Sequence, residues 1–120
     1  MKKVLIVDDA GFMRMSLKKI LESNGFNVIG EAENGLDGVK KFSELNPDIV
    51  TMDITMPEMD GIQALKAIKQ LNKDAKVVMI SALGQEPHIR EAIVQGAKTF
   101  IVKPFKEEFV VKTMNQLAGE

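Results

Sequence analysis

Four short apolar runs of the sequence end in polar residues that could do chemistry. Two adjacent carboxylates, Asp8 and Asp9, follow the first run, and Asp53 closes another. Two later runs end in Ser81 and Lys103. If these runs are parallel strands, their carboxyl ends lie along one edge of a sheet, where ligands bind in open α/β folds. The sequence therefore predicts three carboxylates, a hydroxyl and an ammonium group along a single edge.

This combination of groups suits phosphoryl transfer assisted by a divalent cation. Three carboxylates in one small site repel each other, and a bound cation relieves that repulsion. The candidate ligands are hard oxygens and the chain has no cysteine, which together favour Mg²⁺. A carboxylate can also act as a nucleophile and form an aspartyl phosphate. Lys103, Ser81 and the cation would then position and neutralise the phosphoryl charge.

The apolar runs themselves are typical of buried strands. Each is too short for a helix, is rich in aliphatic or β-branched residues, and is bounded by polar or turn residues. Continuous apolar runs indicate strands that are buried on both faces, as in a parallel sheet. We expect five strands, at residues 4–7, 28–29, 49–50, 77–80 and 100–102.

Between the runs, apolar residues recur at helical spacing. Five stripes predict helices: Met13, Leu17, Ile20 and Leu21; Leu36, Val39 and Phe42; Ile62, Leu65 and Ile68; Ile89, Ala92 and Ile93; Val110, Met114 and Leu117. On the first helix, Arg14 and Lys18 belong to a separate polar face. Gly25 and Gly96 are expected to end the first and fourth helices, and Pro47 follows the second. Five alternating strand and helix units predict an α/β fold, with a parallel sheet between two layers of helices.

Size and composition narrow the classes of protein. A length of 120 residues predicts one domain over residues 1–120, and 45% hydrophobic residues support a folded one. A net charge of -1 gives no indication of nucleic acid or an anionic membrane as partner. No apolar run approaches the about 18 residues that span a bilayer, and the N-terminus lacks a signal-peptide pattern. We therefore expect a cytoplasmic protein.

Several short motifs together resemble the signature of response-regulator receiver domains. In chain order they are Asp8-Asp9, Met52-Asp53, Met56-Pro57-x-Met59-x-Gly61, Ser81-Ala82 and Lys103-Pro104-Phe105, each at a predicted strand end. The resemblance covers the whole chain and is greatest to the stand-alone chemotaxis receivers of Gram-positive and thermophilic bacteria. It implies a flavodoxin-like (βα)5 domain with strand order 2-1-3-4-5. That order is already known for this family and does not follow from residue spacing.

The resemblance also implies a role for each residue of the predicted edge. Asp53 would accept a phosphoryl group from a histidine kinase of the CheA type. Mg²⁺ would be bound directly by Asp9, through water by Asp8, and also by Asp53 and the backbone carbonyl of Thr55. Lys103 would pair with a phosphate oxygen, and the bond from Lys103 to the following proline is expected to be cis.

Two further residues would report the phosphorylation to the rest of the protein. By the same resemblance, Ser81 moves to hydrogen-bond the new phosphoryl group, and Phe100 is a switch aromatic that turns inward on activation. Enteric chemotaxis receivers have tyrosine at the position of Phe100, so its hydroxyl is missing here. A phenylalanine in the fifth strand could equally be an ordinary core residue.

The predicted output is binding of a flagellar motor switch protein to the face formed by the fourth helix, the fifth strand and the fifth helix. The receiver is expected to be a monomer and a phosphoacceptor rather than an enzyme acting on other substrates. A stand-alone phosphorelay receiver of the sporulation type is an alternative with the same catalytic residues. A Mg²⁺-dependent phosphohydrolase is disfavoured because Thr55 stands where its motif needs a second aspartate. A nucleotide or flavin binder is disfavoured because no glycine-rich phosphate loop follows a strand.

Overall fold

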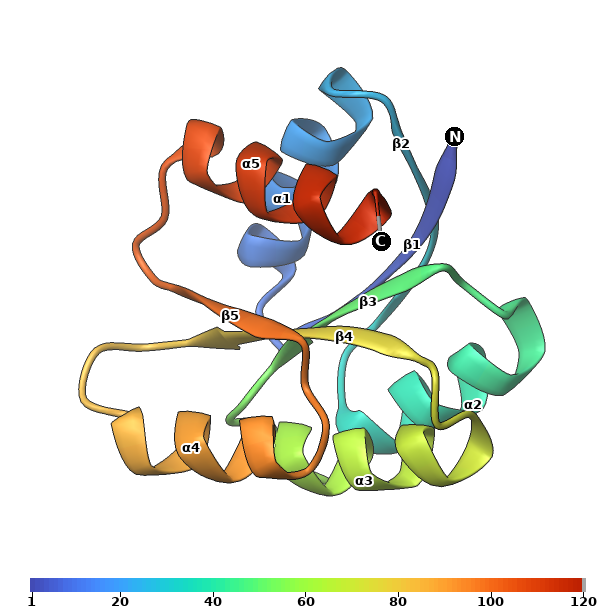
Figure 1. Ribbon diagram of the computed structural model, residues 1–120, viewed down its shortest axis with the longest axis vertical. Coiled ribbons are helices and arrows are strands. Elements are labelled where there is room, and N and C mark those ends of the chain that lie inside the picture. Colours follow the sequence, from blue (N-terminus) through green and yellow to red (C-terminus); the bar gives the residue numbers. More distant parts are fainter. Residues whose placement is uncertain (120) are drawn as a thin grey trace.

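The computed structural model describes residues 1–119 and contains a five-stranded parallel sheet with helices on both faces (Figure 1). The strands are β1 (Lys2–Val7), β2 (Phe26–Ala32), β3 (Ile49–Asp53), β4 (Lys76–Ser81) and β5 (Thr99–Val102). Their order in the sheet is β2-β1-β3-β4-β5, as the family resemblance implied. The predicted domain, residues 1–120, also includes Glu120, which lies outside the described residues.

Helices alternate with the strands along the chain. They are α1 (Gly11–Ser23), α2 (Gly35–Leu45), α3 (Gly61–Leu71), α4 (Glu86–Val94) and α5 (Glu107–Ala118). Figure 1 shows α1 and α5 on one face of the sheet and α2, α3 and α4 on the other. Within residues 1–119, no helix has the length and apolar character needed to cross a membrane.

The sheet separates two hydrophobic cores. Successive strand residues point to opposite faces, so β1 contributes Val4 and Ile6 to one core and Leu5 and Val7 to the other. The first core is closed by α1 and α5, which bury Leu17, Leu21, Val110, Met114 and Leu117. The second is closed largely by α3, which buries Ile62, Leu65 and Ile68. The apolar runs of β1, β3 and β4 are therefore buried on both faces, as predicted, whereas those of the edge strands β2 and β5 are only partly buried.

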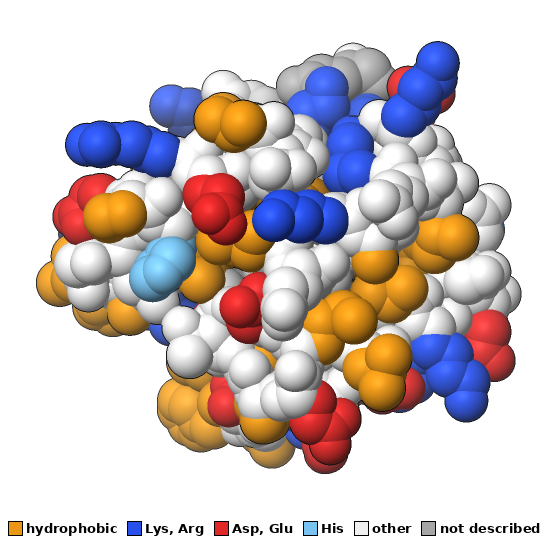
Figure 2. Space-filling model, turned by 90° about the horizontal axis from the view of Figure 1, so that it is seen from below, with side chains coloured by type: hydrophobic (Ala, Val, Ile, Leu, Met, Phe, Trp, Pro, Cys, Tyr) orange, Lys and Arg blue, Asp and Glu red, His pale blue; other side chains and the backbone are white. Residues whose placement is uncertain are grey.

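Two predicted helical stripes are only partly buried. Leu36 in α2 is 57% exposed and Ile93 in α4 is 43% exposed. Helix α2 instead turns Gly38 toward the sheet, where an added Cβ would lie 2.9 Å from Cγ1 of Val7. The helix thus approaches β1 through a residue without a side chain, which a count of large apolar residues overlooks. In Figure 2, the face of the α2–α4 layer correspondingly shows separate groups of hydrophobic side chains among charged ones.

Two glycines end helices as expected. Gly25 has φ +87° and Gly96 has φ +109°, which is the left-handed region where glycine is favoured over residues with a Cβ. Helix α2 ends at Leu45, and its C-cap residue Asn46 has φ 49° and precedes Pro47. These turns return the chain to the start of the next strand, so the carboxyl ends of all five strands meet at one edge.

Candidate functional site

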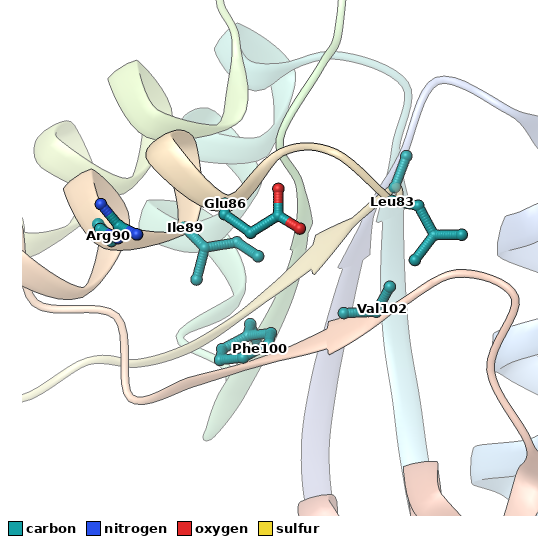
Figure 3. A pocket seen from close by; sticks show the side chains of 7 residues that line it. Leu83, Glu86, Ile89, Arg90, Phe100 and Val102 are labelled. Carbon is teal, nitrogen blue, oxygen red and sulfur yellow. The ribbon is translucent and has the colours of Figure 1, made fainter.

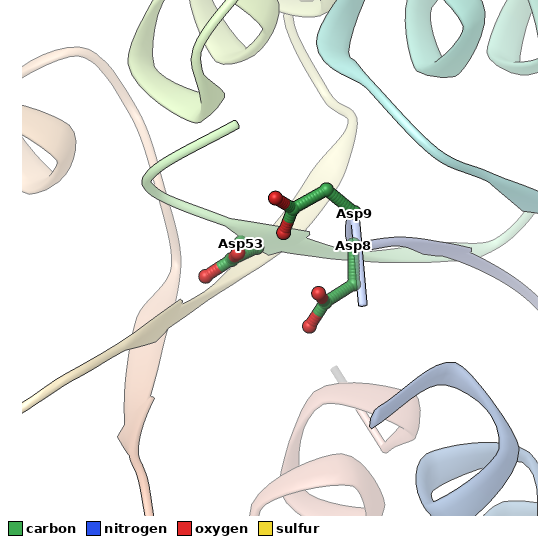
Figure 4. Close-up of side chains that lie close together, drawn as sticks. All are labelled: Asp8, Asp9 and Asp53. Carbon is green, nitrogen blue, oxygen red and sulfur yellow. The ribbon is translucent and has the colours of Figure 1, made fainter. Parts of the chain in front are cut away.

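Three carboxylates meet at the carboxyl ends of the neighbouring strands β1 and β3 (Figure 4). Asp8 and Asp9 directly follow β1, and Asp53 is the last residue of β3. These strands are neighbours, with Val7 paired to Met52, so the two strand ends lie side by side. One ligand oxygen from each carboxylate lies within 4.8 Å of the other two. Asp8 and Asp53 are buried, whereas Asp9 is exposed.

The ammonium group of Lys103, which follows the edge strand β5, lies next to this cluster. Its Nζ lies 3.5 Å from Oδ2 of Asp8 and 3.4 Å from Oδ1 of Asp53. Lys103 directly follows β5, and its backbone N–H donates to the carbonyl of Ser81 at 2.7 Å. The Lys103–Pro104 bond is cis, as the family resemblance implied. The predicted lysine thus reaches both buried carboxylates.

The hydroxyl group of Ser81 is buried and has no hydrogen-bond partner among the described residues. Ser81 is the last residue of β4, the strand next to Asp53, and its side chain is 0% exposed. A buried hydroxyl without a partner is costly, because it loses its bonds to water. The hydroxyl of Thr51 is also buried and unpartnered, but Thr51 lies inside β3, two residues before its end. Ser81 is therefore the unpartnered donor at the strand-end edge.

Burial raises the pKa of Asp53 from its ordinary value of 3.8 to about 6. The negative charge of Asp8 also contributes to this rise and Asp9 adds a smaller contribution, while the charge and hydrogen bond of Lys103 act in the opposite direction. The folded chain thus disfavours the charged form of Asp53 because the carboxylate is buried and lies near Asp8, and Lys103 only partly offsets these two effects. A second cation beside the carboxylate would favour its charged form.

Replacing Asp53 with asparagine is therefore expected to stabilise the metal-free protein. The pKa of Asp53 is higher in the folded than in the unfolded chain, so ionised Asp53 lowers stability above pH 6. We expect Asp53→Asn to raise the free energy of unfolding by about 2 kcal/mol at pH 7 in EDTA, measured by urea denaturation. As pH falls from 6 to 3.8 the folded wild type gains a proton, and the difference should disappear.

The matched control for this measurement is Asp74→Asn, since Asp74 is exposed in the turn before β4. It should change stability by no more than about 0.5 kcal/mol at either pH. A gain for Asp53→Asn that persisted unchanged at pH 3.5 would contradict the electrostatic explanation.

The loop after Asp53 is held by close packing and by the start of α3. The N–H of Gly61 donates to the carbonyl of Ile54 at 2.8 Å, and an added Cβ at Gly61 would lie 2.0 Å from the carbonyl oxygen of Asp53. Asp60 and Gln63 form a capping box, in which each side chain accepts from the other's backbone N–H. Glycine is thus required where α3 begins against the backbone of Asp53.

Thr55 takes part in a bridge between two loops that the sequence did not predict. Its hydroxyl accepts from Nε2 of Gln85 at 2.9 Å, and Oε1 of the same glutamine accepts from the N–H of Ala82 at 2.6 Å. Gln85 therefore ties the loop after Asp53 to the loop after Ser81. No motif pointed to Gln85, because its two partners are distant from each other in the sequence.

The prediction placed Arg14 on a polar face of the first helix. In the structure Arg14 lies against the loop that carries Asp8 and Asp9. Its side chain is 15% exposed, and its Nη1 donates to the backbone carbonyl of Asp8 at 2.6 Å. Nε of Arg14 donates to Oε1 of Glu31 at 3.2 Å. Helical spacing places Arg14 on the correct face, but nothing in the spacing identifies this partner on β2.

Phe100 lies on β5 at the edge of a pocket between the strand and α4. It is 38% exposed, so it is not an ordinary core residue. Figure 3 shows its ring beside Ile89 and Glu86 of α4, with Val102 further along β5 and Leu83 in the loop after Ser81. The pocket thus adjoins both the strand that precedes Lys103 and the loop that follows Ser81.

The donor atoms of the acidic cluster suit Mg²⁺. Carboxylate oxygens are ligands that this ion prefers, and the ion also takes water and phosphate oxygens to complete its shell. A divalent ion would add the positive charge that Lys103 alone does not supply to Asp8 and Asp53. Lys103, Ser81 and the three carboxylates thus lie together at the sheet edge where ligand sites occur in this class of fold. A doubly wound sheet with this arrangement of groups indicates a signalling domain of the receiver class.

Comparison with known proteins agrees with this class. The family model for the response regulator receiver domain matches residues 4–115, so the chain belongs to that family. It is 57% identical over 114 residues to the chemotaxis protein CheY of Bacillus subtilis, covering 95% of each chain. It is 56% identical over 117 residues to CheY of Thermotoga maritima, covering 98% of each chain. The chain is thus a CheY-like receiver along nearly its whole length.

A solved structure supports the same relationship. The CheX–CheY–BeF3–Mg²⁺ complex of Borrelia burgdorferi contains a chain with a TM-score of 0.92 and 45% sequence identity. The match covers 98% of this chain and 89% of that one. The strand order, the cis bond and the edge of polar groups described above are therefore found in a chain of an established signalling family.

Proposed function

We propose that this protein is a chemotaxis response regulator that is phosphorylated on Asp53. The observation that carries the proposal is the position of the Asp53 carboxylate, which is buried between Lys103 and Asp8 at the carboxyl edge of the sheet. A carboxylate in this position has a cation beside it and lies at the strand-end edge where ligands bind in this class of fold. The chemotaxis assignment is supported by the CheY proteins to which the chain is similar.

In this proposal Asp8, Asp9 and Asp53 hold one Mg²⁺ ion together with the backbone carbonyl of Thr55. When bound, the ion supplies positive charge that stabilises the transferring phosphoryl group. Burial and, to a lesser extent, the negative charge of Asp8 raise the pKa of Asp53 to about 6 despite the nearby Lys103, so an added cation would favour the charged form of Asp53. Asp9, as the exposed member, is the carboxylate that an ion entering from solvent meets first.

Phosphoryl transfer then proceeds by attack of an Asp53 carboxylate oxygen on the phosphorus of a phosphohistidine. A P–O bond forms to Asp53 while the P–N bond breaks and the imidazole nitrogen leaves with the electron pair of that bond. Lys103 moves from pairing two carboxylates to pairing a phosphoryl oxygen. The unpartnered hydroxyl of Ser81 donates to another oxygen, so the new group satisfies a hydrogen-bonding group that the unmodified chain leaves unsatisfied.

The proposed readout begins at Ser81 and ends at the α4, β5 and α5 surface. Movement of Ser81 displaces the loop that carries Ala82 and Leu83, which borders the pocket at Phe100. Phe100 is partly exposed and can turn into that pocket when the loop moves. Phosphorylation acts here by favouring one of two conformations that the unmodified chain already samples. The proposed partners are a CheA-type histidine kinase and a flagellar motor switch protein.

A phosphorelay receiver would use the same chemistry with a different output partner. The distinguishing measurement is binding of an N-terminal peptide of a flagellar motor switch protein, with and without beryllofluoride and Mg²⁺, by calorimetry. We expect affinity to rise at least about tenfold in the activated form, which corresponds to a typical coupling free energy above 1 kcal/mol. Phe100→Ala should reduce this gain, whereas Phe12→Ala, at an exposed site on α1 outside the proposed output surface, gives the matched control for loss of a surface aromatic.

Equal affinity of the peptide for both forms would argue against a motor switch protein as the output partner and for a phosphorelay.

We further propose that residues 1–120 act as one receiver domain, as a monomer in the cytoplasm. Its catalysis is confined to its own phosphorylation and dephosphorylation. These assignments follow from the expectations for the family and the near full-length similarity to stand-alone CheY proteins.

A further inference from the structure

The guanidinium group of Arg14 connects the loop of the acidic cluster to β2. Nη1 donates to the backbone carbonyl of Asp8 at 2.6 Å, Nε to Oε1 of Glu31 at 3.2 Å, and Nη2 lies 3.6 Å from Oε1 of Glu33. The three nitrogens thus face three different acceptors. Such a planar fork keeps a fixed direction that a single ammonium group does not.

The backbone of Asp8 is held from both sides. Its N–H donates to the carbonyl of Ala32 at the end of β2 at 3.0 Å, and its carbonyl receives the bond from Arg14. One oxygen of the Asp8 side chain also accepts from the N–H of Ala10 at 2.9 Å. The Asp8 carbonyl belongs to the peptide plane that joins Asp8 to Asp9. Holding that plane therefore fixes the relative positions of the two Cα atoms and restricts the directions in which both side chains leave the backbone.

Glu31 in turn is anchored by other cations. Its carboxylate lies 3.8 Å from Nζ of Lys18, and its backbone carbonyl accepts from Nζ of Lys41 on α2. Arg14 is therefore paired with a carboxylate that a second cation also contacts, on a residue whose backbone is held by Lys41. By contrast, the Asp9 carboxylate is exposed and takes no hydrogen bond from the residues that the structure describes. Its direction depends on the backbone to which it is attached.

We propose that Arg14 is a positioning residue for the divalent cation, acting through the peptide plane between Asp8 and Asp9. The inference rests on the proposed Mg²⁺ site. Its physical basis is that groups which orient metal ligands raise affinity by reducing the ordering that must accompany binding. Arg14 also carries positive charge close to the site, and this charge alone would weaken cation binding. A test must therefore change the geometry and keep the charge.

Arg14→Lys meets that requirement, because lysine keeps the charge and loses the fork. Lys18→Arg is the matched control, since it makes the reverse exchange one turn along the same helix, beside the same Glu31. The chain has no tryptophan or tyrosine to report binding, so Mg²⁺ affinity is measured by titration calorimetry. We expect the Kd for Mg²⁺ to rise about tenfold in Arg14→Lys and to stay within about twofold of wild type in the control.

A second measurement separates positioning from general damage to the fold. Phosphorylation by acetyl phosphate is followed against Mg²⁺ concentration. For Arg14→Lys we expect the rate at saturating Mg²⁺ to approach that of wild type, with the half-saturating concentration shifted about tenfold. An unchanged Mg²⁺ Kd in a folded Arg14→Lys protein would overturn the inference.

A further pair of variants covers the case in which Arg14→Lys does not fold. Glu31→Gln and Glu33→Gln each remove one negative charge, but Glu31 holds Nε of Arg14 at 3.2 Å whereas Glu33 is 78% exposed and 3.6 Å from Nη2. We expect Glu31→Gln to weaken Mg²⁺ binding severalfold more than Glu33→Gln, and equal effects would overturn the inference. Absence of Mg²⁺ binding by the wild type would instead refute the metal site of the proposed function, and the inference with it.

Discussion

Replacing Asp53 by asparagine is expected to abolish phosphorylation of the protein by acetyl phosphate or by a phosphorylated histidine kinase. The amide lacks the anionic oxygen that attacks phosphorus, and no other described carboxylate is both buried and paired with Lys103 except Asp8. The measurement is the stoichiometry of labelling, which should fall from about one phosphoryl group per chain to background. The expected effect is total because the variant removes the atom to which the new bond is made.

The control for this experiment is Asp74→Asn, which changes an exposed aspartate outside the acidic cluster in the same way. Its labelling should equal that of the wild type. Labelling of Asp53→Asn at the wild-type stoichiometry would refute the assignment of Asp53. Asp53→Asn should remain folded, because the same substitution is expected to stabilise the metal-free chain.

Removal of divalent cations is expected to have the second largest effect on phosphorylation. Transfer brings a phosphoryl group to a site that already holds three carboxylates within 4.8 Å and one ammonium group. A divalent cation contributes several kcal/mol to stabilising such a transition state, so its loss should slow labelling roughly a hundredfold to a thousandfold. The measurement is the initial rate of labelling in EDTA and after Mg²⁺ is restored in excess.

Asp9→Asn should imitate this loss without chelation. The exposed carboxylate of Asp9 contributes little to the raised pKa of Asp53, so the variant mainly removes a cation ligand. We expect its Mg²⁺ affinity to fall and its phosphorylation rate to recover partly at high Mg²⁺. Equal labelling rates for the wild type in EDTA and in Mg²⁺ would show that Lys103 suffices and that the acidic cluster has another purpose.

Much of this site was predictable because its residues stand at the ends of recognisable strands. In a parallel sheet, every strand end reaches the same edge, so local patterns place Asp8, Asp53, Ser81 and Lys103 together before any contact is known. Strand order needed the family resemblance, since alternating strand and helix units are compatible with more than one order. The cis bond before Pro104 also came from the resemblance alone.

The residues that support the site were not predictable from spacing. Arg14 and Gln85 act through partners in distant segments, and helical periodicity assigns a residue to a face without naming what lies opposite. The prediction that Leu36 belongs to the buried stripe of α2 was wrong for a related reason. The close approach of α2 to β1 depends on Gly38, which contributes no hydrophobic signal, so Leu36 at the start of the stripe is exposed while Phe42 is buried.

The central claim is that Asp53 itself carries the phosphoryl group, and mapping the modified residue tests it most directly. The protein is incubated with a phosphorylated histidine kinase and Mg²⁺, reduced with borohydride, which converts an aspartyl phosphate to homoserine, and digested for mass spectrometry. Phosphorylation at Asp53 predicts homoserine at position 53 alone, in an amount equal to the phosphoryl group transferred. Homoserine at Asp8 or Asp9, or none at position 53 after stoichiometric transfer, would contradict the claim.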